Sequence, residues 1–175
     1  MTAPEISQVF GELIGLWSAV VWQQMGSPSA LNLVELGPGR GTMMRDMLRA
    51  AALVPGFVDA LRIHLVEQNE ALRAVQARTL GNAGVPICYV DGDALPGGAS
   101  IVLGNEYLDC LPVGQVQWHA QDGEASEWRM RAVGLDDGDR LQFVSGPPPY
   151  AVNDPALSTL PAPRHGDILE DRRVQ

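Results

Sequence analysis

The sequence has little positive charge, cysteine or histidine, and each shortage argues against a class of binding partner or site. It contains no lysine, and its 12 basic residues face 21 Asp and Glu, which gives a net charge of −9 at pH 7. Duplex nucleic acid and anionic membrane surfaces both need a basic footprint, so neither is expected as a partner. The two cysteines, Cys88 and Cys110, fit no metal-ligand spacing and indicate a reducing compartment, and the three histidines are scattered. We therefore expect no metal site.

Long apolar runs and targeting segments are also missing from the sequence. No apolar run approaches the roughly 18 residues of a transmembrane helix, so no membrane insertion is expected. The N-terminus has neither a basic region before an apolar stretch nor an Arg- and Ser-rich composition, so no secretion signal or transit peptide is expected. With the abundance of Ala, Gly and Pro, this predicts a bacterial cytoplasmic protein; a mitochondrial location would require a leader that has been removed.

A glycine turn is the most informative feature that is present. Gly37, Gly39 and Gly41 occupy every second position between an apolar run at 31–36 and a helical pattern at 43–52. Without Cβ atoms the backbone can adopt positive φ and approach a ligand closely. The following helix directs its free N–H groups and its positive dipole end at the turn, which favours a nucleotide-like cofactor carrying a carboxylate or phosphate. The alternative is a tight turn that binds nothing.

The spacing of the glycines narrows the choice of cofactor. A dinucleotide fingerprint needs a third glycine at the sixth position from Gly37, where Thr42 stands, and a P-loop needs a lysine. The pattern E-x-G-x-G-x-G, which begins at Glu35, instead resembles the first motif of class I S-adenosylmethionine (SAM) methyltransferases. That resemblance implies SAM as the cofactor.

Strands and helices alternate over residues 1–112. Apolar runs bounded by Gly or Pro predict strands at 31–36, 61–66, 87–90 and 101–103, and helical spacing predicts helices that end near residues 24, 53 and 80. This order predicts an α/β fold with a doubly wound, Rossmann-like parallel sheet of the class I methyltransferase type, and residues 1–112 form the expected SAM-binding core. Ligands of such sheets lie at the carboxyl ends of the strands.

The pattern changes after residue 112. Residues 113–146 alternate apolar and polar residues around Asp-Gly turns, which predicts an appended antiparallel β meander. Residues 147–175 form a Pro-rich tail without periodicity, expected to be coil, with a possible helix beginning at Gly166.

Acidic residues stand at the ends of the predicted parallel strands. Glu67 closes the second strand, where a carboxylate can accept hydrogen bonds from both ribose hydroxyls. Asp91 and Asp93 follow the third strand, where methyltransferase folds often place a carboxylate against the adenine amino group. The alternatives are a solvated strand end for Glu67 and ordinary Asp-Gly turn chemistry for the two aspartates.

Glu35 lies inside the first strand, where an unpaired charge is costly to bury. It could face the ammonium group of SAM or the N–H groups of the turn. It could equally form an ion pair with Arg40 or Arg45, and the two interpretations are compatible.

A polar segment follows the fourth strand. Asn105, Glu106 and Asp109 place an amide and two carboxylates at the expected cofactor edge, where a methyl acceptor would lie. Carboxylates can orient a guanidinium by charge-assisted hydrogen bonds and accept its proton. The alternative is a helix N-terminus that favours acidic residues.

Four segments together resemble the MidA family of SAM-dependent methyltransferases. They occur in order at Pro4–Leu13, Val34–Thr42, His64–Glu67 and Asn105–Val113. The resemblance implies a class I fold and an arginine acceptor in a protein, because mitochondrial members of this family methylate a subunit of respiratory complex I. By position it implies that Gly37, Gly39, Gly41 and Glu67 carry SAM and that Asn105 and Glu106 face the acceptor.

Family members are roughly twice as long, beyond the usual domain size, and only part of the expected sheet can be placed here. The chain is therefore expected to be a fragment or a shortened product. The first hypothesis is an enzyme that methylates arginine in a protein substrate. The alternative is a SAM-binding or partner-binding remnant without turnover; a nicotinamide enzyme is disfavoured.

Overall fold

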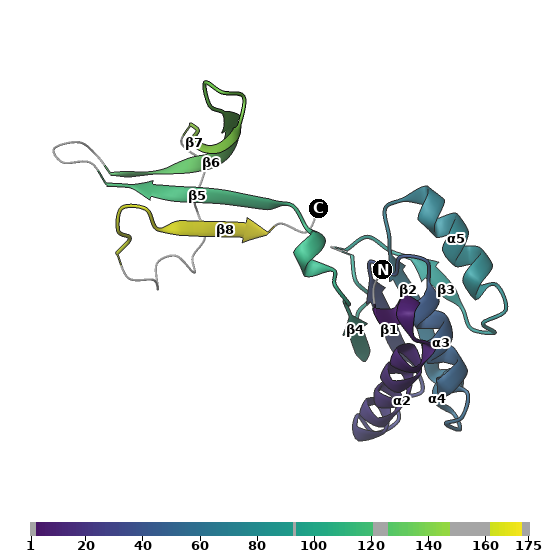
Figure 1. The fold of residues 1–175 in the computed structure, drawn as a ribbon. Coiled ribbons are helices and arrows are strands. Elements are labelled where there is room, and N and C mark those ends of the chain that lie inside the picture. The colour runs from purple at the N-terminus through teal and green to yellow at the C-terminus, as the bar shows by residue number, and fades with distance from the viewer. Residues whose placement is uncertain (1–2, 93, 121–125, 148–161, 173–175) are drawn as a thin grey trace. The chain divides into compact units, whose positions relative to one another are not determined.

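A computed structural model describes residues 3–92, 94–120, 126–147 and 162–172. The chain divides into two compact units, Met1–Cys110 and Leu111–Val174, and each is described by itself (Figure 1). The assignment of three functional segments, 1–112, 113–146 and 147–175, stays a prediction.

The first unit contains a parallel four-stranded sheet. Its strands are β1 (Leu31–Leu36), β2 (Leu61–Val66), β3 (Ile87–Tyr89) and β4 (Ser100–Leu103), in the order β3-β2-β1-β4. β1 pairs in parallel with β2 on one side and with β4 on the other. The order of strands along the chain therefore reverses at β1, which is where open α/β sheets bind ligands. The predicted strands and the doubly wound parallel arrangement are confirmed.

Helices connect and cover these strands. They are α1 (Ala3–Ile6), α2 (Gln8–Gln24), α3 (Thr42–Ala51), α4 (Phe57–Ala60) and α5 (Glu70–Leu80), with a short 3-10 helix η1 at Leu108–Cys110. The single helix predicted before residue 24 is interrupted at Ser7. Ser7 has an extended backbone (φ −144°), and its side chain accepts a hydrogen bond from Val9 N at 3.3 Å, which makes it the N-cap of α2.

Small residues bring α2 and α3 into close contact. The buried positions of α2 include Gly11, Gly15 and Ala19. A Cβ on Gly15 would lie 2.5 Å from the carbonyl oxygen of Met47, so only glycine allows this approach. Two apolar residues at helical spacing in α2 lie away from its buried face: Trp17 is 51% exposed and Val20 is 50% exposed.

The core of the first unit lies between the sheet and its helices. Trp22 packs on Phe57 with ring centroids 5.3 Å apart. Strands β1 and β2 and helix α3 supply most of the other large buried side chains, among them Leu31, Leu33, Leu61, Ile63, Leu65, Met43, Met44 and Met47. None of the described helices is long and apolar enough to cross a membrane.

The second unit is a four-stranded antiparallel sheet. Strands β5 (Val113–His119), β6 (Glu127–Leu135), β7 (Leu141–Ser145) and β8 (Ile168–Arg172) lie in the order β7-β6-β5-β8. The predicted antiparallel meander is confirmed in β5 to β7. The possible helix after Gly166 is wrong, because β8 pairs with β5 and satisfies the backbone groups along that strand's other edge. Most of the Pro-rich segment, residues 148–161, lies outside the described residues.

Candidate functional site

The glycine turn after β1 has the backbone conformation that the sequence predicts. Gly37, Gly39 and Gly41 have φ values of +62°, +53° and +77°, in the left-handed region that disfavours other residues. A Cβ on Gly39 would meet no atom within 4 Å, so the backbone there borders open space. Gly41 is the N-cap of α3 and supplies no side-chain cap, which leaves the helix N-terminus available to a ligand. The turn can therefore receive a small molecule along its backbone.

Glu67 lies directly after β2 and is held by α5. Its Oε1 accepts a hydrogen bond from Asn69 N at 2.9 Å, and its Oε2 accepts one from Nε2 of Gln76 at 3.4 Å. The same Nε2 donates to the carbonyl oxygen of Gly39 at 2.7 Å. Arg73 Nε donates to the backbone oxygen of Glu67 at 2.6 Å. The strand-end carboxylate and the glycine turn are thus linked through one helix.

Gln76 is a site residue that the sequence reasoning missed. It is fully buried although it is polar. A signal was present: Gln76 lies four residues from both Leu72 and Leu80, on the apolar face of α5. A polar side chain on such a face needs a partner, and its partners here belong to the candidate site.

Glu35 is buried in β1, at 3% exposure. Burial raises the pKa of its carboxyl group from 4.5 to about 8, because the charged form loses its hydration. Within the described residues its Oε2 has no hydrogen-bond partner. The ion pair expected with Arg40 or Arg45 is not observed in the described part of the chain, where Arg45 instead pairs with Asp46 at 2.9 Å. A cation that reached Glu35 would favour the charged carboxylate.

The two predicted aspartates follow β3. Asp91 is exposed, and its carbonyl oxygen accepts a hydrogen bond from Ala94 N at 3.0 Å, which forms the turn expected of this sequence. Asp93 lies outside the described residues. Asp91 is therefore placed at the carboxyl end of β3, beside the end of β2.

The segment after β4 packs on the glycine turn through Tyr107. A Cβ on Gly37 would lie 2.6 Å from Cδ2 of Tyr107, so the ring fills the space that Gly37 leaves. Glu106 is exposed and has φ +50°, a conformation that few residues other than glycine adopt. Asn105 is half-buried and Asp109 is exposed in η1. The helix suggested as an alternative is only this single 3-10 turn.

The described candidate residues follow parallel strands that end at the same edge of the sheet. Along that edge the order is Asp91, Glu67, the turn of Gly37–Gly41, and Asn105 with Glu106. At this edge the open backbone of the glycine turn follows β1. The carboxylate of Glu67 lies on one side of the turn, and the loop with Asn105 and Glu106 lies on the other. This arrangement suits an elongated ligand with hydroxyl donors and a second, cationic ligand beside it.

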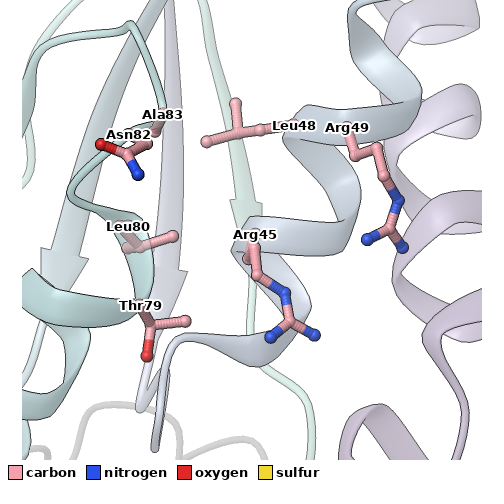
Figure 2. Close-up of a pocket in the computed structure, with 7 residues that line it drawn as sticks. All are labelled: Arg45, Leu48, Arg49, Thr79, Leu80, Asn82 and Ala83. Carbon is pink, nitrogen blue, oxygen red and sulfur yellow. The ribbon is translucent and has the colours of Figure 1, made fainter.

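A pocket elsewhere in the first unit is lined by none of these residues. Its volume is about 310 Å³, and its lining comes from α3 on one side and from the end of α5 and the following loop on the other (Figure 2). The lining residues are Arg45, Leu48, Arg49, Thr79, Leu80, Asn82 and Ala83. No group of three metal-ligating side chains occurs within the described ranges.

A family model matches nearly the whole chain. The family is described as "Putative S-adenosyl-L-methionine-dependent methyltransferase", and the match covers residues 13–171. This match confirms the methyltransferase resemblance seen in the motifs.

Curated relatives are similar to this chain over part of their length. The chain is 37% identical to "Protein arginine methyltransferase NDUFAF7, mitochondrial" of Xenopus tropicalis, over 84% of this chain and 39% of the relative. The Homo sapiens protein of that name is also 37% identical, over 84% and 38%, and that of Danio rerio is 34% identical, over 99% and 46%. The chain thus spans less than half the length of the curated relatives it matches.

A solved structure supports the fold. A protein from Burkholderia thailandensis, described as a "COG1565 superfamily member and likely methyl transferase" and crystallised with S-adenosyl-homocysteine (SAH), matches with a TM-score of 0.67 and 29% sequence identity. The match covers 98% of this chain and 42% of that protein. The class I methyltransferase fold is confirmed.

The predicted location is wrong. The relatives from Xenopus tropicalis, Danio rerio and Homo sapiens are all named as mitochondrial proteins, which contradicts a bacterial cytoplasmic assignment. The prediction rested on bulk Ala, Gly and Pro content and on the lack of a recognisable transit peptide. Bulk composition does not indicate where a protein is targeted, because targeting depends on short local segments.

Proposed function

The chain belongs to this family of S-adenosyl-L-methionine-dependent methyltransferases, and we propose that it binds SAM at the carboxyl edge of its parallel sheet. We further propose that the protein transfers the methyl group of SAM to an arginine of a protein substrate. The proposal on the acceptor is supported by relatives that are named protein arginine methyltransferases.

One observation carries the proposal for SAM. The backbone at Gly39 borders open space, and Gln76 joins it by hydrogen bonds to the carboxylate of Glu67. The glycine turn and the two carboxylate oxygens can therefore contact the same ligand. The turn and the N-terminus of α3 suit the methionine end of SAM, and Glu67 suits the ribose hydroxyls. Asp91 and Asp93 are proposed to meet the adenine amino group. Bound SAM would supply a methyl group already activated on a sulfonium.

We propose that the carboxylate of Glu35 interacts with the ammonium group of SAM, either directly or through the N–H groups of the turn. Its carboxyl group is buried, its Oε2 has no hydrogen-bond partner within the described residues, and burial raises its pKa to about 8. A neighbouring ammonium group would lower this pKa and stabilise the carboxylate. Binding of SAM near pH 7 should therefore release a proton from Glu35.

The acceptor is proposed to lie beside Glu106, Asn105 and Asp109. The two carboxylates would hold a guanidinium by charge-assisted hydrogen bonds, with Asn105 fixing its orientation. The guanidinium nitrogen would take the methyl group that SAM supplies, leaving SAH, and Glu106 would accept the proton that this nitrogen loses. Alignment of donor and acceptor is the main contribution of the protein to the rate. A subunit of respiratory complex I as the acceptor stays a prediction from the family resemblance.

The test separates binding from turnover. We expect the unaltered chain to bind SAM and SAH in calorimetric titrations and to methylate an arginine-containing protein substrate. Glu106→Gln should reduce turnover at least about 100-fold, the lower range for loss of a general base, while SAM affinity changes less than about twofold. The control is Asp59→Asn, which removes an exposed carboxylate preceding the amino end of β2.

Two results would contradict the proposal. Loss of SAM affinity in Glu106→Gln would place Glu106 in the cofactor site and not beside the acceptor. SAM binding with no methyl transfer to any protein acceptor would favour a binding protein without turnover.

A further inference from the structure

Gln76 is a buried amide that touches two parts of the candidate cofactor site. It has no exposed surface, and its Nε2 lies 2.7 Å from the carbonyl oxygen of Gly39 and 3.4 Å from Oε2 of Glu67. Its Oε1 is buried and has no hydrogen-bond partner within the described residues. An unpaired buried oxygen destabilises a fold, and an apolar side chain here would avoid that cost. The amide is therefore better explained by the two groups to which it donates.

Both of those groups need an external restraint. Gly39 has a positive φ, carries no side chain and borders open space, so no packing of its own fixes its carbonyl group. The carboxylate of Glu67 is half-buried, and only its Oε1 bonds to the neighbouring backbone, at Asn69 N. The two N–H groups of a glutamine amide can serve two acceptors at once. Gln76 thus fixes the relative orientation of the turn and the carboxylate.

We propose that Gln76 is a positioning residue that holds Glu67 in the orientation needed to accept hydrogen bonds from the two ribose hydroxyls of SAM. This inference rests on the proposed function. Gln76 acts through Glu67 and Gly39 and makes no contact with the reacting atoms. Its effect through Glu67 is specific to the ribose hydroxyls, whereas any effect through the turn at Gly39 falls equally on every adenosyl ligand.

A purely structural role makes a different prediction. If Gln76 only joined α5 to the turn, its loss would weaken binding of every adenosyl ligand by the same factor. If it positions Glu67, its loss weakens binding of ligands that carry the ribose hydroxyls more than binding of ligands that lack them. Comparison of SAH with 2′,3′-dideoxy-SAH, which lacks both hydroxyls, separates the two roles.

The experiment measures the dissociation constants of both ligands by calorimetry, using the whole chain. For the unaltered protein, loss of two hydrogen bonds to a carboxylate should weaken binding at least about 10-fold. In Gln76→Met, a replacement of similar length without donors, we expect this ratio to fall below about threefold. Gln76→Leu also lacks donors and should give the same result. Circular dichroism melts of each variant establish that it is folded.

The matched control is Thr79→Val on the same helix. The Thr79 hydroxyl donates to the carbonyl oxygen of Val75 at 3.1 Å, within α5, and the side chain is half-buried. This variant should keep the full preference for the hydroxyl-bearing ligand.

Three outcomes would overturn the inference. Equal loss of affinity for both ligands in Gln76→Met would show that Gln76 only joins α5 to the turn. An unchanged ratio in both folded Gln76 variants would show that Glu67 needs no support from Gln76. If the unaltered chain binds neither ligand, the proposed function itself fails, and this failure is distinguishable because no variant is needed to see it.

Discussion

Replacement of Glu35 by glutamine should change how the stability of the protein depends on pH. Glu35 is 3% exposed in the middle of the parallel sheet, and its Oε2 is unpaired within the described residues. Burial raises the pKa of its carboxyl group from 4.5 in an ordinary environment to about 8. Glu35→Gln keeps the shape of the side chain and removes the ionisation.

The sign of the effect follows from proton binding. Below about pH 4.5 the carboxyl group is protonated in both the folded and the unfolded chain, and it contributes no pH dependence. Between about pH 4.5 and about pH 8 the unfolded chain loses this proton while the folded chain keeps it, so the free energy of unfolding falls as pH rises. The slope is about 1.4 kcal/mol per pH unit. From pH 5.5 to pH 7.5 the unaltered protein should therefore lose about 2–3 kcal/mol more than Glu35→Gln.

Urea unfolding at a series of pH values measures this difference. The two proteins should show curves that diverge between pH 5.5 and pH 7.5 and run parallel below pH 4.5. Asp59→Asn, which removes an exposed carboxylate, should follow the unaltered protein. Parallel curves for Glu35→Gln and the unaltered protein throughout this range would refute the claim that Glu35 is buried in its neutral form.

Two further variants test how the site is supported. Gly15→Val should destabilise the fold by about 3 kcal/mol, because its Cβ would lie 2.5 Å from the carbonyl oxygen of Met47; Val20→Ala on the exposed side of α2 should change stability by less than about 0.5 kcal/mol. Chemical denaturation measures both, and equal effects would contradict the close α2–α3 contact. Asn69→Ala should cost about 1 kcal/mol, because Asn69 caps α5 through bonds to Ala71 N at 2.9 Å and Leu72 N at 3.4 Å. An unchanged unfolding midpoint in Asn69→Ala would show that this cap contributes nothing.

The parallel core could be predicted from the sequence because its signals are local. The runs at 31–36 and 61–66 are mostly apolar and end at Gly or at a charged residue, which predicts strands. The carboxyl ends of parallel strands share an edge, so residues after each strand could be expected to gather there. Gly37, Glu67 and Glu106, which follow β1, β2 and β4, are placed accordingly.

The packing of α2 could not be predicted in the same way. Helical spacing of Leu13, Trp17 and Val20 correctly indicated a helix. Periodicity alone did not show that Gly11 and Gly15 form the face against α3, because glycine contributes little to an apolar pattern. Which face of α2 packs on α3 depends on how closely the two backbones can approach, and this depends on the residues of α3 as well.

Gln76 and β8 were missed because their partners are distant in sequence. Gln76 is part of the site only because the turn at Gly39 lies against α5 in the fold. Residues 168–172 become a strand because β5 offers a free edge for pairing. The secondary-structure propensity of residues in a Pro-rich region does not indicate whether a distant strand has an unpaired edge.

The central claim is that the turn at Gly39 binds the adenosyl cofactor, and one calorimetric comparison tests it most directly. Gly39 and Gly84 have φ values of +53° and +70°, and a Cβ on either would meet no protein atom within 4 Å. Gly84 precedes β3, at the amino end of that strand. Alanine at either position should therefore cost a similar small amount of stability, about 1 kcal/mol. The account predicts that Gly39→Ala loses SAH binding while Gly84→Ala keeps it; equal SAH affinity in the two variants would contradict it.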